Sequence, residues 1–160
     1  MNDRNLRRAR EIIDRYPRPR SAILPLAHLA QGQDGYLSRE AMVEIAELVG
    51  ATPAEVYGTC SFYTMFKLEP VGRYIVSVCT NVTCLVLGGP ELYEHLRARY
   101  AEDTDVHVEE VECLAACDGA PCLQVNYDFH LSVTPADADE LVESYKRGER
   151  AARTVSGDRV

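Results

Sequence analysis

Four cysteines in two short-spaced pairs constrain this chain more than any other feature. The first pair, Cys79 and Cys84, lies in the sequence C-T-N-V-T-C, and the second, Cys113 and Cys117, lies in C-L-A-A-C. Residues 85–112 separate the pairs, which is enough chain for one helix and one strand. A fold that joins two such pairs makes a four-thiolate site, the ligand set of iron–sulfur clusters and of structural zinc. The type of ligand alone does not distinguish an iron–sulfur cluster from zinc.

Length and charge limit the classes of protein to which the chain can belong. At 160 residues it can form one ordinary domain, or a small domain with a helical extension. A net charge of −8 and a pI near 5.0 argue against nucleic acid or anionic lipid as main partner, since both select basic surfaces. The charged start MNDRNLRRARE has no apolar core of a secretory signal, and no apolar run reaches the roughly 18 residues of a membrane span. We therefore expect an intracellular protein without direct membrane insertion, whose six cysteines are metal ligands or free thiols.

The first part of the chain has the apolar spacing of short helices. Helices are predicted over residues 4–16, 22–31, 39–49 and 53–66. Ser21, Ser38 and Thr52 are expected to cap the last three helices, and Pro53 suits the first turn of the fourth. We expect residues 1–70 to form a four-helix bundle. The residues expected to face its core include Leu6, Ala9, Ile12, Ile13, Tyr16, Met42, Ile45, Ala46 and Val49.

The pattern changes after residue 70 to short β-rich runs. Strands are predicted over residues 74–78, 106–111, 123–127 and 129–133, with helices over 88–100 and 135–147. The order is a βαβ unit, a β-hairpin and a covering helix, which is how a thioredoxin-like α/β domain is built. We assign this domain to residues 71–147, and we expect the polar residues 148–160 to be a mobile tail.

This topology places the cysteines at one edge of the sheet. Cys79 ends the first strand and Cys84 lies in the loop that follows it. Cys113 and Cys117 lie in the loop after the second strand. Because the ends of neighbouring parallel strands converge, we expect the two loops to meet.

Three motifs together resemble a known family. They are V-Y-G-T-C-S-F-Y-T-M-F at residues 56–66, the C-x4-C pair followed by Gly88-Gly89, and E-C-L-A-A-C-D-G-A-P-C-L-Q-V-N at residues 112–126. They are similar to those of the NuoE-type, thioredoxin-fold [2Fe-2S] subunits of NADH:quinone oxidoreductase, or respiratory complex I. The resemblance covers most of the chain.

The resemblance implies an electron-transfer subunit that is not catalytic alone. By this resemblance, one [2Fe-2S] cluster would be held by Cys79, Cys84, Cys113 and Cys117. The cluster would exchange single electrons with the FMN of a flavoprotein partner that also binds NAD. The complex would hold the chain on the cytoplasmic side, peripheral to the inner membrane. NADH binding by this chain itself is not expected, because it has neither G-x-G-x-x-G nor a P-loop.

Other interpretations stay open at this point. The chain could be the equivalent subunit of an NAD-linked formate dehydrogenase or bidirectional hydrogenase, or a structural zinc module with four cysteine ligands. A thiol–disulfide enzyme is disfavoured because no C-x-x-C is present. Cys60 is expected to pack in a helix. Cys122 is expected to begin the third strand as a small buried residue, with the role of a substitute ligand as its alternative.

Four aromatic residues near the fourth predicted helix have two possible roles. They are Tyr57, Phe62, Tyr63 and Phe66. An aromatic stripe on a helix usually packs into a core, but it can also face a partner. The sequence leaves the choice between these roles open.

Overall fold

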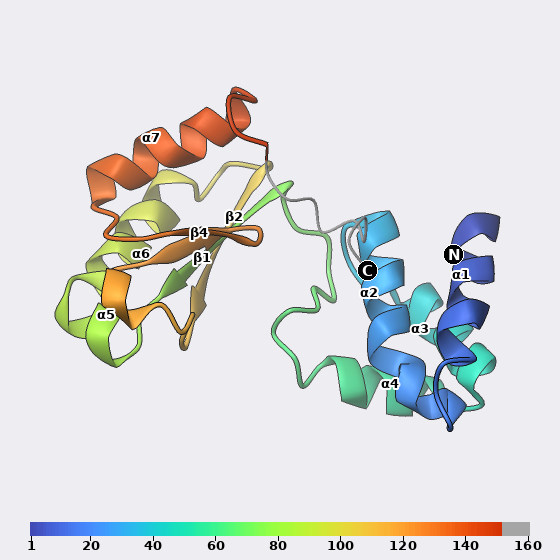
Figure 1. The fold of residues 1–160 in the computed structure, drawn as a ribbon. Coiled ribbons are helices and arrows are strands. Elements are labelled where there is room, and N and C mark those ends of the chain that lie inside the picture. The colour runs from blue at the N-terminus through green and yellow to red at the C-terminus, as the bar shows by residue number, and fades with distance from the viewer. Residues whose placement is uncertain (152–160) are drawn as a thin grey trace. The chain divides into compact units, whose positions relative to one another are not determined.

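The structure is a computed structural model that describes residues 1–151. The described residues separate into two compact units, Met1–Pro70 and a unit that begins at Val71 (Figure 1). Most of the tail predicted over residues 148–160 lies outside the described residues. Within them, no helix has both the length and the apolar character needed to cross a membrane.

The first unit is helical. Its elements are α1 (Asp3–Ile13), a 3-10 turn (Pro19–Ala22), α2 (Ile23–Asp34), α3 (Arg39–Val49) and α4 (Pro53–Cys60). The predicted caps at Ser38 and Thr52 are confirmed, since their side chains accept hydrogen bonds from the backbone N–H groups of Ala41 and Glu55. The Glu55 side chain in turn accepts a hydrogen bond from Thr52 N, which completes a capping box.

The core of this unit comes from apolar faces of its helices. The residues predicted to line it from α3 are confirmed as buried, as is Ala9 of α1, and Val56 of α4 is buried too. Tyr16 is 39% exposed, so its predicted burial is wrong. The buried residues include Leu26, Ala27, Leu37, Met42, Ile45, Ala46, Val49 and Cys60.

Two helix boundaries differ from the prediction because of proline. Helix α1 ends at Ile13 rather than residue 16, since Pro17 disfavours helical backbone at the residue before it. Pro19 opens a 3-10 turn that contains Ser21, so Ser21 does not cap α2. Helix α2 instead begins at Ile23 without a side-chain cap.

Helix α4 ends at Cys60, six residues before its predicted end, because a side chain of α2 holds the following chain. The buried amide of Gln31 donates to Met65 O at 2.9 Å and accepts from Lys67 N at 2.7 Å. Lys67 O in turn accepts from Leu37 N at 2.7 Å. These bonds satisfy buried backbone groups in a non-helical conformation, which competes with continuation of the helix.

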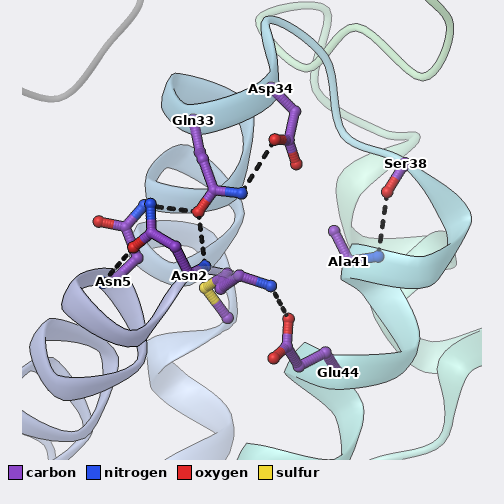
Figure 2. Close-up of polar contacts among 8 residues, drawn as sticks. Asn2, Asn5, Gln33, Asp34, Ser38, Ala41 and Glu44 are labelled. Atoms are coloured by element: carbon purple, nitrogen blue, oxygen red, sulfur yellow. Dashed lines mark hydrogen bonds and ion pairs between the residues drawn. The ribbon is translucent and has the colours of Figure 1, made fainter.

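Polar contacts hold the start of α1 against two other helices (Figure 2). Gln33 Oε1 of α2 accepts hydrogen bonds from Asn2 N at 2.8 Å and from Asn5 Nδ2 at 3.0 Å. The amino group of Met1 forms an ion pair with Glu44 of α3. The α1 terminus therefore has partners on both α2 and α3.

The second unit contains a four-stranded mixed sheet. Its elements are β1 (Tyr74–Cys79), α5 (Val82–Val86), α6 (Gly89–Arg99), β2 (Val106–Val111), a 3-10 turn (Cys117–Gly119), β3 (Leu123–Val125), β4 (Asp128–His130) and α7 (Pro135–Lys146). The strand order is β2-β1-β3-β4, with β1 parallel to β2 and all other neighbours antiparallel. The predicted order of a βαβ unit, a hairpin and a final helix is confirmed.

Both long helices of this unit cover one face of the sheet (Figure 1). Tyr74, Val76 and Val78 alternate along β1 and pack in one core with residues of α6 and α7. Leu92 and Leu96 of α6 are fully buried. The opposite face of the sheet is free of these two helices.

The hairpin strands are shorter than predicted. Strand β3 ends at Val125 because Asn126 takes a left-handed conformation, with φ at 54°, and its Oδ1 accepts from Ile75 N at 2.9 Å. Strand β4 ends at His130, before Ser132, which has a φ of 52°. Helix α5 was not predicted, and the expectation that Cys84 lies in a loop is wrong, since it lies within this helix.

Candidate metal centre

The two cysteine-bearing loops begin side by side, as the predicted topology required. Strands β1 and β2 are parallel, and Cys79 lies directly opposite Val111 at their ends. One residue further on, Thr80 N donates to Val111 O at 3.2 Å. The sulfur of Cys79 lies 3.8 Å from the carbonyl oxygen of Glu112, the residue before Cys113.

Three buried sulfur atoms form a compact group at this edge of the sheet. The Sγ atoms of Cys79, Cys84 and Cys122 all lie within 4.8 Å of one another. Those of Cys84 and Cys122 are 3.8 Å apart. Cys122 directly precedes β3 and is held there by its carbonyl oxygen, which accepts from Cys79 N at 3.1 Å. Its predicted burial is confirmed, but its approach to two predicted ligands was expected only as the less favoured alternative.

The second predicted pair lies around this group rather than in it. Cys113 and Cys117 are exposed, and their sulfur atoms are outside the group of three. Their loop nevertheless contacts the group, because Leu114 and Ala116 pack against it, together with Ala120. The loop therefore covers the buried sulfurs with small and apolar residues and directs two further thiols to the surface.

Backbone N–H groups point at sulfur in both loops. Ala115 N donates to Cys113 Sγ at 3.3 Å. Burial acts to raise the pKa of the Cys79 thiol, but N–H groups of Asn81 and Leu114 donate to its sulfur, and its pKa lies below the ordinary value. Such donors stabilise a thiolate, which is the form that binds metal.

The other two buried sulfurs favour the neutral thiol in the metal-free chain. Burial raises the pKa of Cys84. Burial, followed by the neighbouring Cys84, raises the pKa of Cys122 to about 12. A bound metal reverses this preference because a coordinating thiol is deprotonated outright.

The donor set fits a metal that takes sulfur ligands. Two thiolates on one tetrahedral metal with bonds of about 2.3 Å lie roughly 3.8 Å apart, close to the separation of Cys84 and Cys122. Helix α6 also approaches the site closely. A Cβ atom at Gly89 would lie 2.6 Å from Cys79 O and 2.9 Å from Cys84 O, so only glycine fits there.

Helix α5 carries an apolar surface beside the cysteines. Cys84 is buried, whereas the remaining apolar residues of α5 and the residue after it are exposed. We call this surface the α5 patch: Val82 (73% exposed), Leu85 (58%), Val86 (81%) and Leu87 (53%). The sequence signal for this patch was the apolar run around Cys84. The run did not predict a helix, because β-branched valine lowers helix propensity and five residues are too few for a helical pattern.

Acidic side chains flank the start of α5. Glu110 accepts from Thr80 Oγ1 at 2.6 Å, and Glu112 accepts from Asn81 Nδ2 at 3.3 Å. Asn81 is the residue immediately before α5. The α5 patch therefore borders on negative charge.

Cys60 belongs to the first unit and is fully buried in its core, so its predicted packing role is confirmed. Burial raises the pKa of its thiol to about 11. The aromatic residues near it divide between the two predicted roles. Phe66 is buried, with its ring centroid 4.7 Å from that of His28, whereas the others are exposed. The exposed ones are Tyr57 (50%), Phe62 (79%) and Tyr63 (38%).

Comparison with known proteins gives the same fold and the same kind of centre. A family model described as thioredoxin-like [2Fe-2S] ferredoxin matches residues 9–146. The H2-reduced form of an NAD+-reducing [NiFe]-hydrogenase is similar in structure, with a TM-score of 0.64 and 25% identity. That match covers 76% of this chain and 22% of the hydrogenase chain.

Two curated relatives, both subunits of NADH-quinone oxidoreductase, are similar along most of the chain. The one designated E in Mycobacterium tuberculosis is 45% identical over 153 residues, which is 91% of this chain and 61% of the relative. The one designated E 2 in Rhizobium meliloti is 37% identical over 143 residues, which is 85% of each. The chain thus spans about three fifths of the length of the mycobacterial relative.

Proposed function

Because the chain belongs to the thioredoxin-like [2Fe-2S] ferredoxin family, we propose that it is an electron-transfer subunit of an NADH:quinone oxidoreductase. Its part is to hold one [2Fe-2S] cluster. The observation that carries the proposal is the group of buried sulfurs at the strand ends, enclosed by a loop with two more thiols. The relatives' names favour the quinone-reducing complex over a formate dehydrogenase or a hydrogenase.

The ligands we assign are Cys79 at the end of β1, Cys84 in α5, and Cys113 and Cys117 in the segment after β2. Two observations support the assignment. Residues on either side of Cys113 contact the sulfur of Cys79, so the second loop borders directly on the buried sulfurs. Both loops also offer N–H donors to sulfur, which stabilise the charged form of a ligand.

When bound, the cluster takes up and releases one electron at a time. The residues of this chain control its surroundings. Leu114, Ala116 and Ala120 exclude water from the buried sulfurs, and the N–H donors of Asn81 and Leu114 stabilise negative charge on Cys79.

The partner we propose is a flavoprotein subunit that binds FMN and NADH. The rest of the complex would hold the chain at the cytoplasmic side of the inner membrane. In this arrangement residues 71–147 form the cluster domain and residues 1–70 form a four-helix bundle. The division into two compact units supports this organisation.

Metal content tests the proposal directly. Protein prepared without oxygen should contain about two irons per chain, be reddish-brown, and show a rhombic EPR signal only after reduction by dithionite. About one zinc per chain and no colour would support the structural zinc module instead. A colourless, metal-free protein with a reversible disulfide would support the thiol–disulfide enzyme.

The α5 patch is the surface we assign to the flavoprotein partner. It is apolar, lies on the helix that contains Cys84, and borders on Glu110 and Glu112, so a matching partner surface would be apolar with a basic rim. Electron exchange requires close approach, and this patch is beside the sulfurs.

A charge placed in the patch should weaken assembly. Val86→Asp is expected to lower affinity for the FMN-binding subunit at least ~10-fold, because burial of a carboxylate in an apolar contact is unfavourable. The matched control is Val43→Asp on α3, where the valine is 43% exposed in the first unit. Affinity is measured by titration of the purified subunits. Equal affinities for both variants would contradict the assignment.

A further inference from the structure

Cys122 is a fifth thiol that the proposed ligand set does not use. It is 1% exposed, and its sulfur lies 3.8 Å from that of Cys84. Packing alone does not require sulfur here, since an aliphatic side chain would fill a buried position before a strand equally well. The site therefore contains one more potential ligand than a [2Fe-2S] cluster uses.

The backbone holds Cys122 firmly in this position. Its carbonyl oxygen accepts from Cys79 N at 3.1 Å, which ties it to the end of β1. On its other side, Pro121 O accepts from Val133 N at 3.0 Å. A change of its side chain from one staggered rotamer to another moves Sγ by roughly 3 Å. The 3.8 Å separation between the sulfurs of Cys84 and Cys122 is thus comparable to the distance that such a rotation covers.

We infer that Cys122 is a reserve iron ligand, whose sulfur replaces that of Cys84 when Cys84 Sγ no longer binds. The inference rests on the proposed function, since it needs an iron–sulfur cluster at this site. The exchange involves no oxidation or reduction. The S–H bond of Cys122 breaks and its proton passes to water, while a bond forms between iron and Cys122 Sγ. The bond to Cys84 Sγ breaks, and that thiolate takes up a proton.

Removal of the Cys84 sulfur tests the inference. Cys84→Ala leaves no donor atom at residue 84, yet it is expected to retain about two irons per chain and a visible spectrum of sulfur ligation. Cys84→Ala/Cys122→Ala is expected to lose iron at least ~10-fold. The matched control is Cys84→Ala/Cys60→Ala, which removes a buried thiol of the first unit and should behave as Cys84→Ala does. Iron analysis, visible spectra and EPR are recorded on each protein, with circular dichroism to establish folding.

Cys84→Ser adds a measurement that does not depend on the double variant. If Cys122 takes over, the spectra and EPR g-values of Cys84→Ser and Cys84→Ala should coincide, because sulfur binds in both. Different spectra would show serine oxygen as the ligand and overturn the inference. Loss of iron from Cys84→Ala, or full iron in Cys84→Ala/Cys122→Ala, would overturn it too. A wild-type protein without iron would instead overturn the proposed function.

Discussion

Cys113→Ser is expected to lose at least ~90% of the bound iron and the visible absorption that accompanies it. Cys113 is exposed, and among the described residues its sulfur lies outside the group of three buried sulfurs, so none of those thiols stands ready to replace it. Serine oxygen is a poorer ligand for iron than thiolate, because soft sulfur ligands select iron–sulfur clusters. Since metal binding contributes folding free energy, the second unit should also lose stability when the metal is lost. Iron analysis, visible spectra and thermal unfolding measure these effects.

Cys60→Ser is the control, because it should lower stability without changing the iron content. Cys60 is fully buried in the helical unit, so a hydroxyl without a partner there should cost about 1–3 kcal/mol of stability. Its iron content and spectrum should equal those of the wild type, because it lies in the other unit. An unchanged spectrum in Cys113→Ser would remove Cys113 from the ligand set.

Helix starts that depend on a local cap were predictable, although the predicted cap at Ser21 does not form. Ser38 and Thr52 cap helices as the sequence indicates, and Thr134 caps α7 in the same way, because an N-cap depends on residues only three positions apart. Helix ends depended on distant residues. Helix α4 ends at Cys60 because Gln31, on another helix, bonds the chain after it, and no local pattern reports that contact.

The candidate site also has one part that the local sequence predicts and another that depends on contacts between distant residues. The meeting of the two cysteine loops follows from a parallel βαβ unit, so the sequence predicts it once the strands are placed. The approach of Cys122 to Cys84 depends on how the residue before β3 pairs with the end of β1. That pairing links residues far apart in the chain, and spacing between cysteines does not indicate it. Gly89 is part of a motif in the sequence, but its close approach to the backbone of Cys79 and Cys84 becomes visible only in the structure.

Gly89→Ala is expected to disturb the metal centre from a position that carries no ligand. Its Cβ would lie 2.6 Å from Cys79 O and 2.9 Å from Cys84 O. Both neighbours are backbone atoms, so they cannot move aside by a change of rotamer. Either the start of α6 or the backbone of the two cysteines must shift. Overpacking of this kind costs about 1–3 kcal/mol, and each kcal/mol lowers the Tm by about 2–4 °C in a chain of this size.

Gly58→Ala is the matched control, because Gly58 also lies in a helix but an added Cβ would meet nothing within 4 Å. That substitution should stabilise its unit by about 0.5–1 kcal/mol, as alanine favours helix over glycine. Thermal unfolding and the rate at which a chelator removes iron distinguish the two variants. Gly89→Ala should unfold at lower temperature and release iron faster, whereas Gly58→Ala should release it at the wild-type rate. Equal iron release from both variants would show that the close approach of α6 does not hold Cys79 and Cys84 in place.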